Sequence, residues 1–340
     1  MIYRLDLFWT NSPALVVHPK TDRTICTPLE SHARTDGAHG VTRPTTARAY
    51  LPPFTAVIAA WMLVLSSVVP VPAQPFQLPT ANRALFEKEG EERFFVGTVA
   101  YLNTRPSLSN FGNYIVLRHA IGGVDIYSSY AHLREIRPGL KAGQTVKAGE
   151  AIATMGRTAN THEGISKDRA HLHFELNLFV NDRFPAWHKK TFPGQRNDHG
   201  VWNGQNLIGL DPRLILVEQQ MAGAKFDLWR FIQGQTGLCR VVVRATDFPW
   251  LRRYPGLVRP NPKVAKEGIA GYEVALNFNA VAFELIPRAA SEIKGQAKFQ
   301  LLSVNETECH KNRCRRLVTQ RGGRWELTSR GLNALELLTY

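Results

Sequence analysis

The sequence predicts a mainly β protein, and three observations lead to this class. Short apolar runs alternate with turn-forming residues between positions 95 and 180. Four glycines divide the string GLKAGQTVKAGEAIATMG, 139–156, where they allow tight turns between small strands. Further strand-like runs recur in the last third of the chain, between loops rich in Lys and Arg. We therefore expect a first β domain over 95–185 and a small β-rich domain over 222–340.

The expected strands follow one another along these two regions. In the first region they are FFVGTVAYL, NFGNYIVLRHA, VDIYSSYAHL and HLHFELNLFV. In the second they are LCRVVVRATDF, GYEVALNFNAVAFELI and AKFQLLSVNE, and RWELTSRGLNALELL closes the chain. Between the regions, 186–221 is rich in Gly, Pro and aromatic residues and has little hydrophobic periodicity, so we interpret it as a long ordered connecting excursion.

The run AHLHFELNLF, 170–179, places two histidines at alternating positions. Side chains of an extended strand alternate between its faces, so His171, His173 and Glu175 share one face. The apolar residues between them face the opposite side. Unless the alternation arose by chance, two aligned imidazoles indicate a metal site or acid–base chemistry.

The N-terminal part carries the pattern of an export signal. No charged residue occurs from Leu51 to Asn82, and Ala56–Val69 is a continuous apolar run. The run is short for a membrane span and is followed by Ala73, where a signal peptidase could cut. We expect 51–73 to be a signal peptide, or an uncleaved anchor that would be the only membrane contact. The mature protein is then exported to the periplasm, the cell envelope or the extracellular space.

The residues before this signal lack hydrophobic periodicity. We interpret 1–50 as a disordered leader or an over-extended start that packs against nothing, and 74–94 as a lead-in to the first domain.

The charge balance restricts the partners. The formal net charge is +14, and residues 1–73 contain six Lys or Arg and four Asp or Glu, which leaves +12 from Gln74 onward. A basic exported protein suits an anionic cell-wall polymer or an acidic membrane surface. Nucleic acid is disfavoured, because export removes the opportunity and no binding motif is present.

The cysteines agree with an oxidising compartment. Cys309 and Cys314 stand across a short loop in CHKNRC, where a hairpin disulfide is expected. Cys26 falls in the leader, and Cys239 is interpreted as a buried thiol rather than a nucleophile.

Four motifs resemble the lysostaphin/LytM-type zinc endopeptidases, which cut peptide crosslinks in bacterial peptidoglycan. The motifs are GNYIVLRH (112–119), YAHL (130–133), GQTVKAGEAIATMG (143–156) and HLHFEL (171–176), in the order and at the spacing of that family. The resemblance implies a LytM-like β-sheet sandwich, the duplicated hybrid motif, and zinc as the cofactor. It also implies that His173 is a zinc ligand and that His171 and His132 are the catalytic histidines.

These residue types fit the chemistry of peptide hydrolysis. A hydrolytic zinc needs three protein ligands and one open position, and it polarises the scissile carbonyl. A nearby imidazole can take the proton of the attacking water, and a second can steady the oxyanion. Here His171 is the expected base and His132 the expected oxyanion partner.

The chain departs from the family at its first zinc motif, HxxxD. No histidine occurs between Gln74 and His119, and HxxxD strings such as His32–Asp36 occur only ahead of the signal. Asp125, in GGVDIY, lies in a hairpin that has its own place in the pattern, so we do not count it as a ligand. His162 and His199 remain speculative substitutes.

Two function classes therefore stay open at the level of sequence. One is an exported zinc endopeptidase of the cell wall. The other is a non-catalytic LytM-like module that binds the wall or activates a wall amidase. Zinc content distinguishes them.

Overall fold

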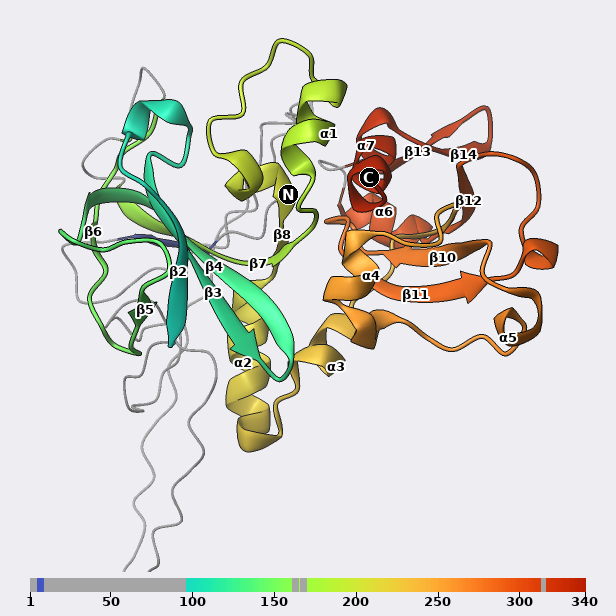
Figure 1. Ribbon diagram of the computed structural model, residues 1–340, viewed down its shortest axis with the longest axis horizontal. Coiled ribbons are helices and arrows are strands. Elements are labelled where there is room, and N and C mark those ends of the chain that lie inside the picture. Colours follow the sequence, from blue (N-terminus) through green and yellow to red (C-terminus); the bar gives the residue numbers. More distant parts are fainter. Residues whose placement is uncertain (1–4, 9–95, 161–164, 166–169, 313–315) are drawn as a thin grey trace, which may run out of the picture. The chain divides into compact units, whose positions relative to one another are not determined.

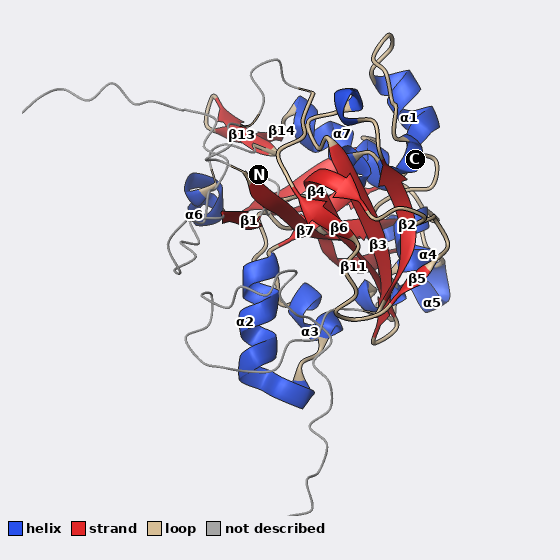
Figure 2. Ribbon diagram, turned by 90° about the vertical axis from the view of Figure 1, so that its left-hand side faces the viewer, coloured by secondary structure: helices blue, strands red, loops and turns tan. Residues whose placement is uncertain are grey.

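The computed structural model describes residues 5–8, 96–160, 165, 170–312 and 316–340. Its largest sheet has eight antiparallel strands in the order β1-β7-β4-β3-β2-β5, with β6 paired to β4 and β8 paired to β7. These strands are β1 (Leu5–Phe8), β2 (Gly97–Asn103), β3 (Asn113–Ile121), β4 (Val124–Ile136), β5 (Thr145–Val146), β6 (Ala153–Met155), β7 (His171–Phe179) and β8 (Leu207–Leu210). Strands β2, β3, β4 and β7 lie side by side in Figure 1 and again in Figure 2. The predicted mainly β fold is confirmed.

The second region also contains the predicted strands. An antiparallel sheet runs in the order β11-β10-β9-β12, formed by β9 (Cys239–Val243), β10 (Gly271–Leu276), β11 (Ala282–Arg288) and β12 (Phe299–Val304). A separate hairpin pairs β13 (Val318–Arg321) with β14 (Arg324–Leu327). The remaining helices here are α3 (Leu228–Gln233), α4 (Pro249–Arg253), α5 (Val264–Glu267), α6 (Glu306–Lys311) and α7 (Ser329–Leu338).

The connecting excursion contains helices that weak periodicity did not reveal. These are α1 (Phe184–Thr191) and α2 (Pro212–Ala222). Local capping explains the start of α2, because Asp211 accepts hydrogen bonds from the backbone N–H groups of Arg213 and Leu214 at 2.9 and 3.2 Å. A proline follows the cap, at the first helical position, where its missing N–H costs nothing.

Strand β7 is buried on both faces, and this explains why its apolar residues are so regular. Leu172, Phe174, Leu176 and Leu178 belong to the main apolar core, which contains residues from Val99 to Leu338. The hydroxyl of Tyr254 anchors the end of the strand by accepting from the backbone N–H of Phe179 at 2.8 Å. Because one core includes side chains of both regions, the expected domain boundaries stay a prediction.

The cysteine expectations are met where the structure describes them. Cys239 is a buried free thiol, and burial, with Cys309 nearby, raises its pKa to about 12. A thiol that stays protonated is a poor nucleophile, as expected for a core residue. Cys314 lies outside the described residues, so the disulfide with Cys309 stays a prediction.

Part of the N-terminal expectation is wrong. Strand β1 pairs with β7, with Asp6 opposite His173 and Phe8 opposite His171 in the register. Residues 5–8 are therefore part of the sheet. The edge of β7 offers backbone groups with which such a segment can pair. The rest of 1–50, the signal segment 51–73 and the lead-in 74–94 lie outside the described residues. Within the described part of the chain, no helix has the length and apolarity needed to cross a membrane.

Candidate active site

Three imidazoles meet on the front of the large sheet, the face opposite the main core. The ring centroid of His132 lies 5.0 Å from that of His171 and 5.3 Å from that of His173. His132 belongs to β4, and the HxH pair belongs to β7, which runs beside β4 with Ala131 opposite His173. All three side chains are buried. The structure thus brings together the three histidines that the motifs single out.

An irregularity in β4 turns His132 toward this cluster. The register between β3 and β4 shifts between Asn113 and Ile115, and such a shift re-aims a side chain. His132 has φ of 60°, a left-handed conformation that is uncommon for a residue with a Cβ. Its backbone N–H donates to the carbonyl of Phe111 at 2.9 Å. Its ring Nδ1 donates to the carbonyl of Thr158 at 2.9 Å.

A buried carboxylate fixes the proton on one nitrogen of His173. Glu175 Oε1 lies 2.7 Å from His173 Nε2, and because an ionised carboxylate only accepts, this nitrogen carries the hydrogen. The second oxygen of Glu175 accepts from the Asn177 amide at 3.2 Å, and that amide also donates to Ser129 Oγ at 3.2 Å. The carboxylate is therefore held in place from both sides.

The other nitrogen of His173 has the properties of a metal donor. With the proton on Nε2, Nδ1 carries a lone pair, and this buried atom has no hydrogen-bond partner in the described structure. Metal-bound histidines commonly donate their second ring N–H to a carboxylate, as His173 does to Glu175. His173 thus fits a zinc ligand.

The described residues do not provide a complete set of metal donors. Among them, no group of three or more His, Cys, Asp or Glu side chains is arranged to hold a metal ion. His132 and His171 are therefore not shown to be co-ligands of His173.

Asp125 and His119 take no part in the cluster. Asp125 pairs with Arg118 at 2.8 Å in the β3–β4 hairpin, as expected for a residue unrelated to the site. His119 donates from Nδ1 to the Val96 carbonyl at 3.0 Å, and its Nε2 lies 2.7 Å from Ser128 Oγ. Burial lowers the pKa of His119 to about 4, so its ring is neutral at pH 7.

The two speculative zinc ligands are not supported. His162 lies outside the described residues. His199 bonds through Nδ1 to the Tyr101 hydroxyl at 3.0 Å and packs against Tyr114 at 5.1 Å between ring centroids. Burial lowers the pKa of His199 and raises that of Tyr101. This pair belongs to an aromatic cluster beside the site rather than to the three imidazoles.

That aromatic cluster was not predicted from the sequence. Trp202, from the connecting excursion, packs on Tyr127 and Phe179 with ring centroids 5.7 and 5.4 Å apart. Phe111 links the cluster to the site, since its ring lies 5.3 Å from Tyr114 and 5.1 Å from His173. The aromatic content of the excursion was visible in the sequence, but its contacts span almost a hundred residues.

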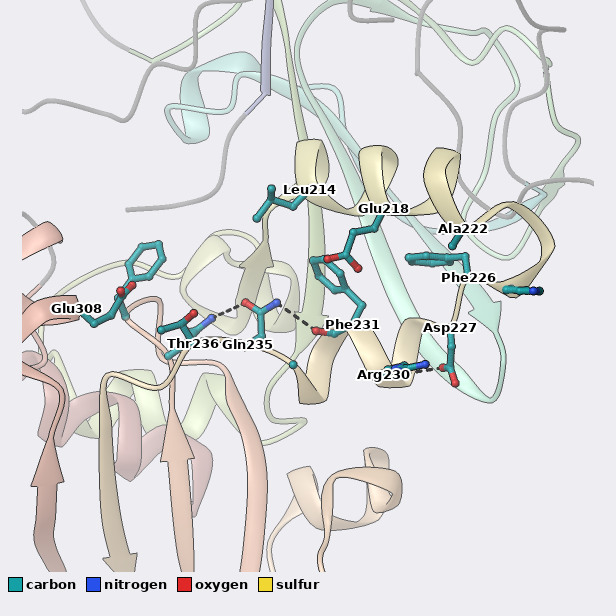
Figure 3. Close-up of a pocket in the computed structure, with 14 residues that line it drawn as sticks. Leu214, Glu218, Ala222, Phe226, Asp227, Arg230, Phe231, Gln235, Thr236 and Glu308 are labelled. Atoms are coloured by element: carbon teal, nitrogen blue, oxygen red, sulfur yellow. Dashed lines mark hydrogen bonds between the residues drawn. The ribbon is translucent and has the colours of Figure 1, made fainter.

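A separate pocket lies away from the histidines. Figure 3 shows it between α2 and α3, with Leu214, Glu218 and Phe231 among its lining residues. The Gln235 amide donates to the Phe231 carbonyl at 3.3 Å there. None of the three site histidines lines this pocket.

Comparisons with known proteins agree with the motifs. Residues 94–184 match the model of Peptidase family M23. No curated protein sequence matches the chain. A protein described as a glycyl-glycine endopeptidase LytM, from Ruminococcus gnavus, is 26% identical over 25% of this chain and 32% of its own, with a TM-score of 0.20. The catalytic domain of the antimicrobial peptidase lysostaphin, from Staphylococcus simulans, is 24% identical over 30% of this chain and 73% of its own, with a TM-score of 0.18. The chain thus spans about a third of the first of these relatives.

Fold and site together define a β-sheet domain that carries a histidine cluster suited to hydrolysis. The segment 94–184 matches Peptidase family M23, and the predicted resemblance is confirmed for this part of the chain.

Proposed function

We propose that this chain is an exported zinc-dependent peptide hydrolase that cuts peptide crosslinks of peptidoglycan. The M23 match supports a peptidoglycan-hydrolase-like function for 94–184. The single observation that favours an active enzyme is the state of His173. Its Nδ1 is buried and unpartnered, while Glu175 holds the proton on Nε2. A buried nitrogen without a partner is costly unless a ligand satisfies it.

The roles of the three histidines follow from their positions. A zinc ion bound at His173 would supply Lewis acidity for the scissile carbonyl and for a water molecule. His171 takes the proton of the attacking water, and His132, when both of its ring nitrogens carry protons, donates a hydrogen bond to the oxygen that becomes negative. The ring centroid of His132 lies 5.0 Å from that of His171 and 5.3 Å from that of His173. The three side chains are therefore close enough to act on one bound peptide.

The partner we propose is the anionic cell wall itself. The net charge of +12 from Gln74 onward favours association with such a polymer. Export through 51–73 would bring the chain to that substrate.

Release of new amino groups from purified peptidoglycan tests this function. The full chain, loaded with zinc, should produce them, and His171→Ala or His173→Ala should lower the rate by at least about a hundredfold. His310→Ala is the matched control, because His310 is exposed and lies outside the site. Its rate should equal that of the unmodified chain.

The same assay distinguishes this function from the alternative, a non-catalytic module. A non-catalytic module would release no amino groups at any zinc concentration. It would still bind sedimented peptidoglycan or raise the activity of an added wall amidase. That pattern of results would overturn the proposal. The observation that favours the alternative is the incomplete set of metal donors among the described residues.

A further inference from the structure

We propose that Thr158 is a positioning residue that fixes the proton of His132 on Nδ1, so that Nε2 carries the lone pair of the neutral ring. The catalytic part of this inference rests on the proposed function. The tautomer does not, since it follows from hydrogen bonding alone.

The proton position follows from the partner of the ring. Nδ1 of His132 lies 2.9 Å from the backbone carbonyl oxygen of Thr158. A carbonyl oxygen only accepts hydrogen bonds, so Nδ1 must be the donor. In the neutral ring, Nε2 then carries the lone pair.

The side chain of Thr158 holds this carbonyl in place. Its Oγ1 donates to the Leu133 carbonyl at 2.8 Å and accepts from the Asn113 backbone N–H at 2.9 Å. Leu133 directly follows His132 in β4, and Asn113 pairs with Leu133 across the two strands. One hydroxyl therefore ties the loop after β6 to both strands at the point where His132 leaves the regular register.

Gly112 makes room for this close approach. A Cβ built on Gly112 would lie 2.2 Å from the Thr158 carbonyl oxygen and 2.4 Å from Oγ1, and Gly112 has φ of 60°. Only glycine adopts such a conformation without strain and leaves this space empty. The Asn103 amide donates to the Gly112 carbonyl at 2.7 Å and so fixes the turn from the other side.

We call this arrangement the Thr158 lock: the Thr158 carbonyl accepts from Nδ1 of His132, and the Thr158 hydroxyl holds that carbonyl in place. The lock also offsets the backbone strain at His132. A residue with a Cβ at positive φ is strained and persists only where its surroundings hold it. Here the Phe111 carbonyl holds the backbone N–H of His132, and the Thr158 carbonyl holds its ring.

The lock restricts what His132 can do in the reaction. With Nδ1–H already donated to Thr158, a neutral His132 can only accept a hydrogen bond through Nε2. It can donate to an oxyanion through Nε2 only when both of its nitrogens carry protons. Which ring nitrogen of a histidine can react depends on the group to which its other nitrogen is hydrogen-bonded.

Nitrogen NMR of the histidine side chains in the metal-free full chain tests the inference, with the His132 signals assigned by His132→Gln. In the unmodified protein we expect the proton on Nδ1 of His132. Thr158→Val removes the hydroxyl and should convert His132 to a mixture of tautomers, whereas Thr158→Ser should restore the Nδ1–H form. Thr154→Val is the matched control, since Thr154 is exposed on neighbouring β6.

Peptidoglycan hydrolysis by the same variants gives the second readout. Thr158→Val should lower kcat roughly 10- to 100-fold with KM little changed, and Thr158→Ser should recover most of the loss, because misplacing a catalytic group acts on the transition state. Gly112→Ala, which pushes the same carbonyl from the opposite side, should reproduce the tautomer change.

The outcomes separate this inference from the proposed function. A neutral His132 with its proton on Nε2 in the unmodified chain would overturn it, whether or not any variant folds. An unchanged tautomer in Thr158→Val would overturn the role of the hydroxyl. If the tautomer shifts as expected but no form of the protein cleaves peptidoglycan, the lock stands and the proposed function fails.

Discussion

Mild acid should destabilise this protein through His119, a buried histidine outside the cluster of His132, His171 and His173. Its side chain is 2% exposed and is bonded to the Val96 carbonyl and to Ser128. Burial lowers its pKa from 6.5 to about 4. Below pH 6.5 the unfolded chain gains a proton at this residue and the folded chain does not. Stability is therefore present above the unfolded pKa, falls as the pH drops toward 4, and changes no further below the folded pKa.

The size of the effect follows from the two pKa values. Their difference corresponds to a loss of roughly 3 kcal/mol in the free energy of unfolding between pH 7 and pH 4. Urea unfolding at several pH values in this range measures it. His119→Gln cannot gain the charge, so its free energy of unfolding should fall by about 3 kcal/mol less over the same interval. His199, whose pKa burial also lowers, remains in both proteins and cancels in the comparison.

Equal pH dependence in the two proteins would refute this reasoning. It would mean that His119 is hydrated or protonated in the folded chain, and that its bonds to Val96 and Ser128 do not exclude water.

Three further outcomes test the packing and the site. Phe174→Ala should cost about 3–5 kcal/mol in urea unfolding, because Phe174 is 1% exposed in the core behind β7. Glu175→Gln should weaken zinc binding roughly 10- to 100-fold in a chelator competition, because it removes the carboxylate that holds the proton of His173 on Nε2. Arg118→Ala should change stability by less than about 1 kcal/mol and leave hydrolysis unchanged, because it breaks a surface ion pair with Asp125.

Each of these has a result that would count against the account. A loss below about 1 kcal/mol in Phe174→Ala would place that ring outside the core. Unchanged zinc affinity in Glu175→Gln would remove the argument from the tautomer of His173. Loss of hydrolysis in Arg118→Ala would bring Asp125 into the site after all.

The sequence was sufficient for the parts of the fold that depend on local periodicity. The alternation in HLHFELNLF predicted a strand with an apolar back and histidines on its front, and β7 has this form. The YAHL motif predicted that His132 would join them, and the ring distances agree. These features depend on period-2 alternation and on one neighbouring strand.

Features that depend on distant contacts were out of reach. Thr158 lies 26 positions from His132, and nothing in the string GRTAN indicates that its carbonyl meets that ring. Position 132 has a positive φ but is not a glycine, so the sequence gives no local indication of the irregularity in β4. Helix α2 was missed for another reason: its start is marked by a local cap, Asp211 followed by Pro212, and our interpretation of 186–221 considered periodicity instead. The pairing of residues 5–8 with β7 likewise depends on an open sheet edge.

Zinc content of the purified full chain tests the central claim most directly. After zinc loading and exhaustive dialysis, the account predicts about one equivalent per chain, lost in His173→Ala and retained in His310→Ala. No retained zinc, or the same content in the His173→Ala variant, would contradict it.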